Sequence, residues 1–210
     1  MKNKGILYRS LVTLFFVAIA TLSFSEANAQ QRVQLKLGYH PSFPIGSFKD
    51  FMNENSFRGF MGELSYPINN RIKVGLGVSY NDYYEKHPRA LHQTTQGTVS
   101  AVITNSIQTT PIQARGYYDL TEGNIRPYVG IGIGGNLVGY SQYWGEFGER
   151  EYTFKPSFSA DAGINIPFNK TTRASGINLG AHFNYLPYNK NGLDNLNNWG
   201  VHAGVFFPLK

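Results

Sequence analysis

The stretch from Ile72 to Asn81 constrains the fold more than any other part of the chain. Its residues, IKVGLGVSYN, alternate between apolar and non-apolar through all ten positions. A two-residue repeat is typical of a β-strand whose two faces meet different surroundings. The apolar face has four aliphatic residues and Tyr80, whereas the other face carries Lys73, two glycines, Ser79 and Asn81. Two successive glycines on the non-apolar face indicate a crowded space there rather than open water.

Seven further segments alternate in the same way, which predicts an all-β chain with eight strands. The predicted strands are Arg32–His40, Phe60–Tyr66, Ile72–Asn81, a long one within Val99–Leu120, Ile125–Leu137, Ser157–Phe168, Gly176–Tyr185 and Trp199–Leu209. In the fourth strand the apolar positions are odd up to Ile107 and even from Ile112. This change of phase predicts a bulge or bend near Thr110 and Pro111.

The connections between these strands alternate strictly between long and short. The short ones are Pro67–Arg71, Thr121–Asn124 and Asn169–Ser175, and the long ones are Pro41–Gly59, Asp82–Thr98, Val138–Pro156 and Leu186–Asn198. Antiparallel strands with short turns at one end and long loops at the other form an up-and-down barrel. The crossings of a β-sandwich would scatter the loop lengths instead.

Aromatic residues at both ends of the apolar face indicate that this face points outward, into lipid. Near the long loops lie Tyr39, Phe60, Tyr80, Phe158, Tyr185 and Trp199, and near the short turns lie Tyr66, Tyr118, Phe168 and Phe207. Two aromatic girdles around an aliphatic band are typical of a protein at the two interfaces of a bilayer. The prediction is an eight-stranded antiparallel up-and-down transmembrane β-barrel. A soluble lipocalin-like barrel, with its apolar face inside, is the alternative.

The first residues have the three parts of a secretory signal peptide. Lys2, Lys4 and Arg9 form the basic region, residues 11–22 the apolar region, and Ala27-Asn28-Ala29 the cleavage site. We therefore expect residues 1–29 to be removed and residues 30–210 to form the barrel domain. The chain has no cysteine, which excludes disulfides and a lipid-modified N-terminal cysteine.

Two stretches resemble the small outer-membrane β-barrel family of Gram-negative bacteria, which includes the OmpX/OmpW-like and OmpA-barrel-like proteins. The closing segment HAGVFFPL, with Gly204, Phe207 and Leu209, resembles the family's terminal assembly signal, although the chain ends on Lys210 rather than an aromatic residue. The segment RPYVGIGIG, residues 126–134, resembles a common strand of these barrels. The resemblance implies an outer-membrane location. It also implies the barrel-assembly machinery, outer-membrane lipid and lipopolysaccharide as partners.

The inward phase of the predicted strands carries most of the strand charges. These residues are Lys36, Glu63, Lys73, Arg115, Asp119, Arg126, Asp161, His182 and His202. The lumen of an eight-stranded barrel is only wide enough to be filled by side chains, and buried charges need partners. We therefore predict an ionic plug centred on Glu63, Lys73, Arg115 and Asp161. A gated path through the same residues is the alternative.

No catalytic, metal or cofactor site is predicted. His182 and His202 lie in the same phase on neighbouring strands, but no third metal ligand is spaced to join them. A lipid A-modifying enzyme would need a base and a nucleophile within hydrogen-bond reach, and the sequence pairs none. No clustered basic stripe indicates nucleic-acid binding.

The predicted function is therefore non-enzymatic. We expect a monomeric barrel with a structural or surface-binding role, exerted through four long extracellular loops that meet a ligand the sequence does not identify. Passage of small hydrophobic molecules, as in OmpW-like barrels, is the alternative, and a lipid-modifying enzyme is the third possibility.

Overall fold

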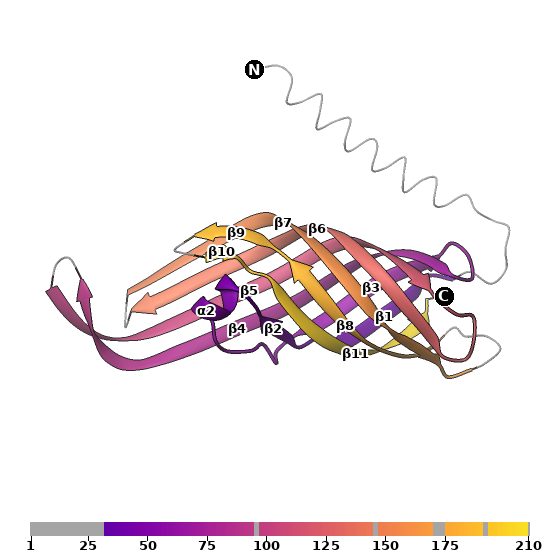
Figure 1. Ribbon diagram of the computed structural model, residues 1–210, viewed down its shortest axis with the longest axis horizontal. Coiled ribbons are helices and arrows are strands. Elements are labelled where there is room, and N and C mark those ends of the chain that lie inside the picture. The colour runs from indigo at the N-terminus through magenta and orange to yellow at the C-terminus, as the bar shows by residue number, and fades with distance from the viewer. Residues whose placement is uncertain (1–31, 95–96, 145–146, 170–174, 191–192, 210) are drawn as a thin grey trace, which may run out of the picture. The chain divides into compact units, whose positions relative to one another are not determined.

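The chain folds almost entirely into antiparallel β-strands. The structure, a computed structural model, describes residues 32–94, 97–144, 147–169, 175–190 and 193–209 (Figure 1). Its elements are β1 (Gln34–Tyr39), β2 (Ser42–Pro44), α2 (Ser47–Phe51), β3 (Phe60–Pro67), β4 (Ile72–Thr94), β5 (Gly97–Asp119), β6 (Arg126–Trp144), β7 (Phe147–Pro167), β8 (Gly176–Tyr185), β9 (Pro187–Lys190), β10 (Leu193–Asn195) and β11 (Asn198–Pro208). The predicted signal peptide, residues 1–29, lies outside the described residues.

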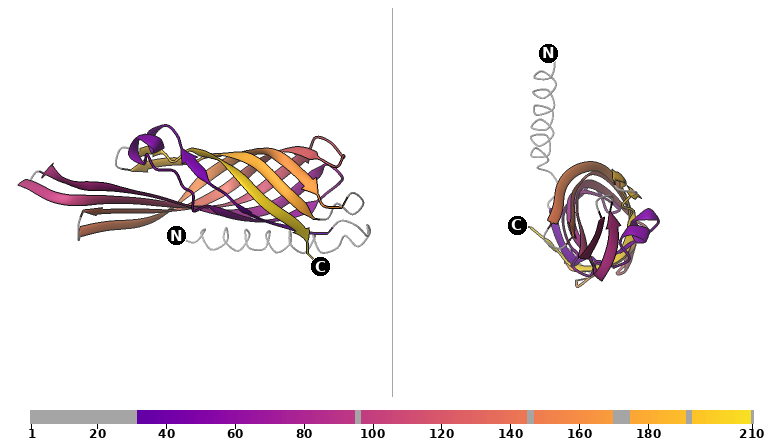
Figure 2. Two further views of the ribbon diagram at one scale, coloured as in Figure 1. Left: turned by 90° about the horizontal axis from the view of Figure 1, so that it is seen from below. Right: turned by 90° about the vertical axis from the view of Figure 1, so that its left-hand side faces the viewer.

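Eight of these strands close into a ring. The order around it is β1-β3-β4-β5-β6-β7-β8-β11, and β11 pairs with β1 to complete it. Each neighbouring pair is antiparallel, and the closing pair runs from Gln34 opposite Pro208 to Tyr39 opposite Ala203. Viewed end-on, the strands form a closed ring (Figure 2, right). The predicted eight-stranded antiparallel barrel is confirmed.

The two faces of the ring have opposite chemistry. Leu76 and Ile131 point outward and are 63% and 73% exposed, whereas Glu63 and Arg115 point inward and are 3% and 8% exposed. The alternation of Ile72–Asn81 therefore separates an apolar exterior from a polar interior. A lipocalin-like barrel would have the reverse arrangement.

The longest strands extend well beyond the ring. β4 and β5 have 23 residues each, β6 has 19 and β7 has 21. Two of the four predicted loops, Asp82–Thr98 and Val138–Pro156, are therefore largely extensions of these strands, and the prediction of loops there was wrong. The β4–β5 and β6–β7 hairpins project from one end of the barrel, here called the mouth (Figures 1 and 2).

The other two long connections fold over the mouth. Residues 41–59 contain β2 and α2, and residues 186–197 contain β9 and β10. Together these two segments are called the cap. They contact each other, since α2 packs on β10 and the Ile45 amide donates to the Asn197 carbonyl at 3.1 Å. β2 pairs with β11 beyond the end of β1, so it continues that side of the ring after the break at Pro41.

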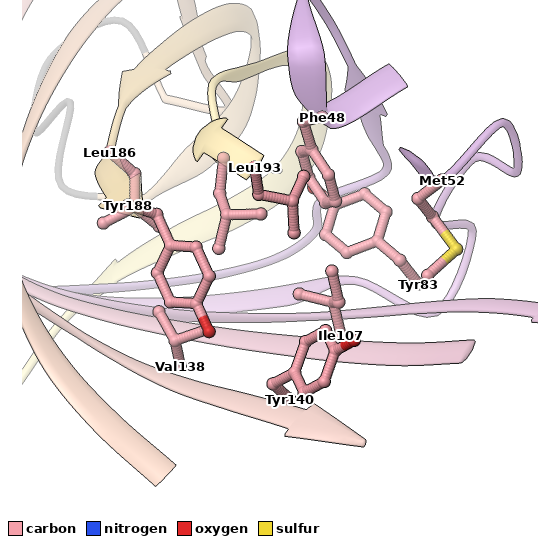
Figure 3. Close-up of a cluster of buried hydrophobic side chains, with 10 residues drawn as sticks. Phe48, Met52, Tyr83, Ile107, Val138, Tyr140, Leu186, Tyr188 and Leu193 are labelled. Atoms are coloured by element: carbon pink, nitrogen blue, oxygen red, sulfur yellow. The ribbon is translucent and has the colours of Figure 1, made fainter. Parts of the chain in front are cut away.

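The cap encloses an apolar core. Ten buried side chains form this cap core: Phe48, Met52, Tyr83, Ile107, Val138, Tyr140, Leu186, Tyr188, Leu193 and Leu196. Figure 3 shows those from α2, β9 and β10 pointing toward those from the extended strands. The barrel itself has a polar interior, so the apolar core of this protein lies beyond the ring.

Of the bulge or bend predicted near Thr110 and Pro111, the bulge is absent. The register between β5 and β6 runs without a shift from Ile103 opposite Trp144 to Asp119 opposite Tyr128. The β4–β5 ladder is interrupted between Val78 and Asn81, opposite Thr110 and Pro111, without a change of register, and its register shifts only between His87 and Ala90 of β4. The odd-numbered side chains of β5 face inward wherever the structure describes them, but the environment on each side of the strand changes along it. Within the ring the apolar side chains face outward, and beyond it Ile107 faces inward to the cap core.

No helix in the described part of the chain is long and apolar enough to cross a membrane.

Candidate functional site: a filled lumen beneath a capped mouth

Glu63 of β3 is the centre of the first ionic cluster in the lumen. One carboxylate oxygen, Oε1, lies 3.3 Å from Lys36 Nζ, and the other, Oε2, lies 3.4 Å from an Arg115 guanidinium nitrogen. The Tyr117 hydroxyl donates to Oε2 at 2.5 Å. Two other strands of the ring, β1 and β5, therefore direct charges and a hydroxyl to one buried carboxylate, which satisfies the need of a buried ion for partners.

A second cluster lies toward the short turns. The Asp119 carboxylate is 2.8 Å from Lys73 Nζ and 3.7 Å from an Arg126 guanidinium nitrogen. A cavity of about 20 Å³ between the two clusters is lined by Lys36, Glu63, Lys73 and four other polar residues, with Phe206. That volume holds about one water molecule, which is too little for a continuous path.

Three imidazoles fill the lumen near the mouth. The rings of His40 and His182 are stacked with centroids 3.7 Å apart, and His202 lies 6.0 Å from His182. The Tyr128 hydroxyl is 3.0 Å from His202 Nε2, and the Asp161 carboxylate is 3.9 Å from His202 Nδ1. The two predicted lumen histidines thus meet each other and a third.

Sequence reasoning missed His40 as a lumen residue. Its position at the end of the predicted first strand, in phase with Lys36 and Gly38, was the available signal. Its amide donates to the Gly59 carbonyl at 3.0 Å, and its ring nitrogen Nδ1 lies 3.4 Å from Asn81 Nδ2. These contacts hold the imidazole at the boundary between the ring and the cap.

Glycines on the inner face make room for the large side chains of the plug. A Cβ atom on Gly77 would lie 2.7 Å from the Arg115 side chain, and one on Gly130 would lie 2.4 Å from the Tyr117 ring. The contact at Gly77 is the crowding that the paired glycines of β4 indicated. Any larger residue there would displace a member of the Glu63 cluster.

Neutral polar side chains fill the remaining space and connect the plug to the cap. Asn178 donates to Asn165 at 2.8 Å, and Asn184 donates to Asn198 at 2.9 Å. Ser42 Oγ donates to the same Asn198 side chain and accepts from the Tyr83 hydroxyl, both at 2.8 Å. Tyr83 belongs to the cap core, so one hydrogen-bonded chain runs from the lumen into the cap.

The structure places all eight residues of the predicted ionic network inside the barrel. Lys36, Glu63 and Arg115 meet in the first cluster, and Lys73 and Arg126 meet at Asp119 in the second. Asp161, His182 and His202 lie in the third group, near the mouth. The predicted network is therefore divided into three groups along the lumen rather than joined around one centre.

The predicted girdle residues lie on the outer face. Those near the long connections are opposite one another on neighbouring strands, with Tyr39 facing Phe60, Phe60 facing Tyr80, and Phe158 facing Tyr185. At the other end, Tyr66, Tyr118, Phe168 and Phe207 are half-buried or exposed. Phe43 of β2 was not predicted. Its ring centroid lies 4.8 Å from that of Trp199, so the cap contributes to the girdle.

The predicted assembly signal forms the seam of the barrel. Gly204 lies opposite Gly38, and Phe207 lies opposite Leu35. A Cβ atom on Gly204 would lie 2.4 Å from the Leu37 carbonyl oxygen, so this glycine permits the close approach of the first and last strands. Leu209 follows β11, and its amide donates to the Val33 carbonyl at 2.8 Å.

The described residues contain no group of three or more His, Cys, Asp or Glu side chains arranged to hold a metal ion. The parallel stacking of His40 on His182 explains why three neighbouring imidazoles do not form such a site. Stacked rings direct their nitrogens sideways, not toward a common point.

A closed antiparallel ring with an apolar exterior and a charged, filled interior defines an integral outer-membrane β-barrel. The chain belongs to the outer membrane protein beta-barrel domain family, whose model matches residues 12–207. The predicted family and the predicted outer-membrane location are confirmed. No curated protein matches the sequence significantly.

Among solved structures, the fold is similar to Neisserial surface protein A, NspA, with a TM-score of 0.56 and 15% identity over 85% of this chain and 97% of that one. It is also similar to outer membrane protein OprG from Pseudomonas aeruginosa, with a TM-score of 0.51 and 9% identity over 86% and 97% of the two chains. Ail, the attachment invasion locus protein of Yersinia pestis, has a TM-score of 0.47 and 18% identity over 85% and 99%. At these identities the likeness concerns the fold.

Proposed function

We propose that this protein is a non-conducting, non-enzymatic outer-membrane barrel with a structural or surface-binding role. The observation that carries the proposal is the occupied lumen. Two ionic clusters and a histidine stack follow one another along its length, and the cap core lies over its mouth. A small lumen filled in this way stabilises the barrel and leaves no route for a solute.

The passage of small hydrophobic molecules gains no support from this interior. An apolar solute entering from the mouth would first have to separate Tyr83, Ile107 and the other cap-core side chains. It would then meet the desolvated Glu63 cluster, whose ion pairs it would break without replacing them. Breaking such a pair inside a low-dielectric interior is strongly unfavourable.

An enzymatic role is disfavoured by where the candidate bases lie. His40, His182 and His202 are all buried inside the barrel, where the acyl chains of lipid do not reach. His87 lies on the β4 extension, and its ring nitrogen is 3.9 Å from the Glu85 carboxylate. No serine joins that pair in the contacts of the described residues, so the triad required for acyl transfer is not assembled.

The part of the protein that projects from the membrane consists of β-strands. We therefore assign the binding role to this projecting sheet rather than to four long loops. The β4–β5 and β6–β7 hairpins form a sheet that projects past the cap (Figure 2, left). The free edge of β4 carries a register shift, Pro88 and Lys86, and that of β7 carries Glu149, Arg150 and Lys155. Bulges, proline and charge on an edge strand oppose uncontrolled pairing with other chains. Such edges favour a monomer that meets its partners through a face of the sheet.

The proposed topology places the mouth outside the cell and both termini in the periplasm. The mature chain starts at Gln30, after cleavage of the signal peptide, and the barrel-assembly machinery reads the closing segment of β11. Outer-membrane lipid and lipopolysaccharide surround the girdled exterior. In the surface-binding role, the projecting sheet contacts the extracellular ligand.

Single-channel recording in planar bilayers tests this proposal. The wild-type protein should give no stable openings at moderate voltage. A variant carrying Glu63→Ala and Arg115→Ala removes the first cluster and should leave conductance low, because the histidine stack and the cap remain. Deleting residues 45–55 as well, which removes α2, should produce openings only when His40, His182 and Asp119 are also replaced by alanine, because the histidine stack and the second cluster otherwise still fill the lumen. Stable openings of the wild-type protein would contradict a filled lumen.

A further inference from the structure

Three aromatic rings lie over glycines on the outer face of the projecting β6–β7 hairpin. A Cβ atom on Gly135 would lie 1.8 Å from the Phe154 ring, one on Gly139 would lie 3.0 Å from the Tyr152 ring, and one on Gly148 would lie 2.3 Å from the Tyr143 ring. Each ring therefore occupies the space that a side chain at the facing glycine would need. Because the rings lie against the sheet, one face of each is turned away from the protein.

These three rings are exposed. Tyr152 is 64% exposed, Phe154 is 63% exposed and Tyr143 is 40% exposed. Tyr152 and Phe154 are two residues apart on β7 and so lie side by side on one face. Here these three rings are called the aromatic platform. The aromatic platform is separate from the cap core, because Val138 and Tyr140 of the same hairpin pack into the cap core from the opposite face of the sheet.

A cation borders the aromatic platform. The Arg150 guanidinium carbon lies 5.1 Å from the centroid of the Tyr152 ring, within the range of a cation–π contact. Arg150 is exposed, and it lies on the same face of β7 as Tyr152 and Phe154 because the three residues are two positions apart. A ligand lying on Tyr152 would therefore also meet a planar guanidinium, a group suited to phosphate and carboxylate.

The platform stands above the outer aromatic girdle. Phe154 and Tyr152 are four and six residues beyond the girdle residue Phe158 along β7. At about 3.3 Å per residue and a strand tilt of about 40°, they lie about 10 and 15 Å above it. That level is outside the hydrocarbon, on the side of the barrel that faces neighbouring lipid. Burial in acyl chains therefore does not explain these exposed rings.

We propose that the aromatic platform binds the sugar and phosphate groups of lipopolysaccharide molecules standing beside the barrel. This inference rests on the proposed orientation in the outer membrane, with the mouth outside. The C–H faces of pyranose rings pack on exposed aromatic rings, and phosphates pair with Arg150. The height, the outward direction and the guanidinium together fit the headgroup layer of the outer leaflet, and they distinguish this face from the cap.

The direct test measures binding of lipopolysaccharide to the purified barrel in phospholipid nanodiscs. Fluorescently labelled lipopolysaccharide with a complete core is titrated against the wild-type protein and against a variant carrying Tyr152→Ala and Phe154→Ala. The variant should bind at least tenfold more weakly. The matched control is Tyr84→Ala, which removes an exposed aromatic residue from β4 and should change affinity less than twofold. Circular dichroism verifies that each variant is folded.

Two further measurements identify the part of lipopolysaccharide that is bound. Lipid A without core sugars should bind the wild-type protein and the double variant equally, because it lacks the groups that reach the platform. Arg150→Gln should weaken binding of phosphorylated core and leave dephosphorylated core unaffected. The proposal would be overturned if the wild type and the double variant bound complete lipopolysaccharide with equal affinity. It would also be overturned if these two proteins bound soluble polysaccharide lacking lipid A equally well. The absence of channel openings in planar bilayers does not depend on lipopolysaccharide binding. A negative binding result would therefore leave the proposed function intact.

Discussion

Ile107 and Ile112 lie on the same strand and give a sharp test of the change in surroundings along β5. Ile107 is fully buried in the cap core, between Tyr83 of β4 and Tyr140 of β6 in the paired register. Ile112 points outward from the ring and is 49% exposed. The same substitution, isoleucine to alanine, should therefore affect the cap at one position and not at the other.

The expected cost of Ile107→Ala follows from its burial. The substitution removes three carbon atoms, worth about 0.8 kcal/mol each when buried, or about 2.4 kcal/mol together. The flanking tyrosine rings belong to strands held in register, so the site collapses only partly and a cavity term is added. The total should lie at about 2–5 kcal/mol. Since 1.4 kcal/mol is a factor of ten, the cap should open at least about 30-fold more often.

Amide hydrogen exchange measures this opening where it occurs. The Met52 amide donates to the Phe48 carbonyl at 2.8 Å, and the Leu196 amide donates to the Leu186 carbonyl at 2.9 Å. Both bonds belong to the cap, so Ile107→Ala should speed exchange of both amides by that factor. Ile112→Ala should leave both unchanged. Less than threefold acceleration by Ile107→Ala, or equal acceleration by the two variants, would refute the assignment of Ile107 to a cap core.

Three further predictions concern the lumen, the lipid-facing surface and the cap. Glu63→Ala leaves Lys36 and Arg115 buried without their carboxylate and should cost about 3–5 kcal/mol in urea unfolding from lipid vesicles; an unchanged midpoint would disprove the first cluster. Leu76→Arg places a charge in lipid and should cost about 2–4 kcal/mol in the same assay, whereas a neutral outcome would mean that this face does not meet the bilayer. Burial raises the pKa of the Tyr83 phenol above its ordinary value of 10.0, so its contribution to stability holds below pH 10 and is lost as the pH rises further. Proteolysis of the cap should accordingly accelerate above about pH 10, and Tyr83→Phe should remove that pH dependence; a Tyr83→Phe protein with the wild-type profile would exclude this residue as the cause.

The ring could be predicted from the sequence because each of its rules is local. Alternation in Ile72–Asn81 and its counterparts separates the two faces of every strand, and the girdle residues mark where the apolar band ends. Inward phase then identified Glu63, Arg115 and the other buried charges one residue at a time. The eight strands and their antiparallel pairing follow from the same periodicity and from the alternation of short and long connections.

The partners within the lumen depend on registers that no local rule specifies. Sequence phase places Asp119 and Asp161 inside, yet only the paired strands bring Lys73 and Arg126 to Asp119 and His202 to Asp161. His40 joins its stack because Gly59 and Asn81 hold it where the ring meets the cap. Side chains from distant parts of the chain meet at these points.

The cap depends entirely on tertiary contacts and could not be predicted from the sequence. It also explains why a bulge was wrongly predicted in β5. The shift of apolar residues from odd to even positions was real, but a strand of constant phase produces it when lipid outside the ring gives way to an apolar core inside the mouth. Phe48, Leu186 and Leu196 supply that core from segments with no strand periodicity of their own. Periodicity reports that the two faces of a strand differ. Which of the two faces meets an apolar environment, at each level of the barrel, is determined by what the rest of the chain packs against it.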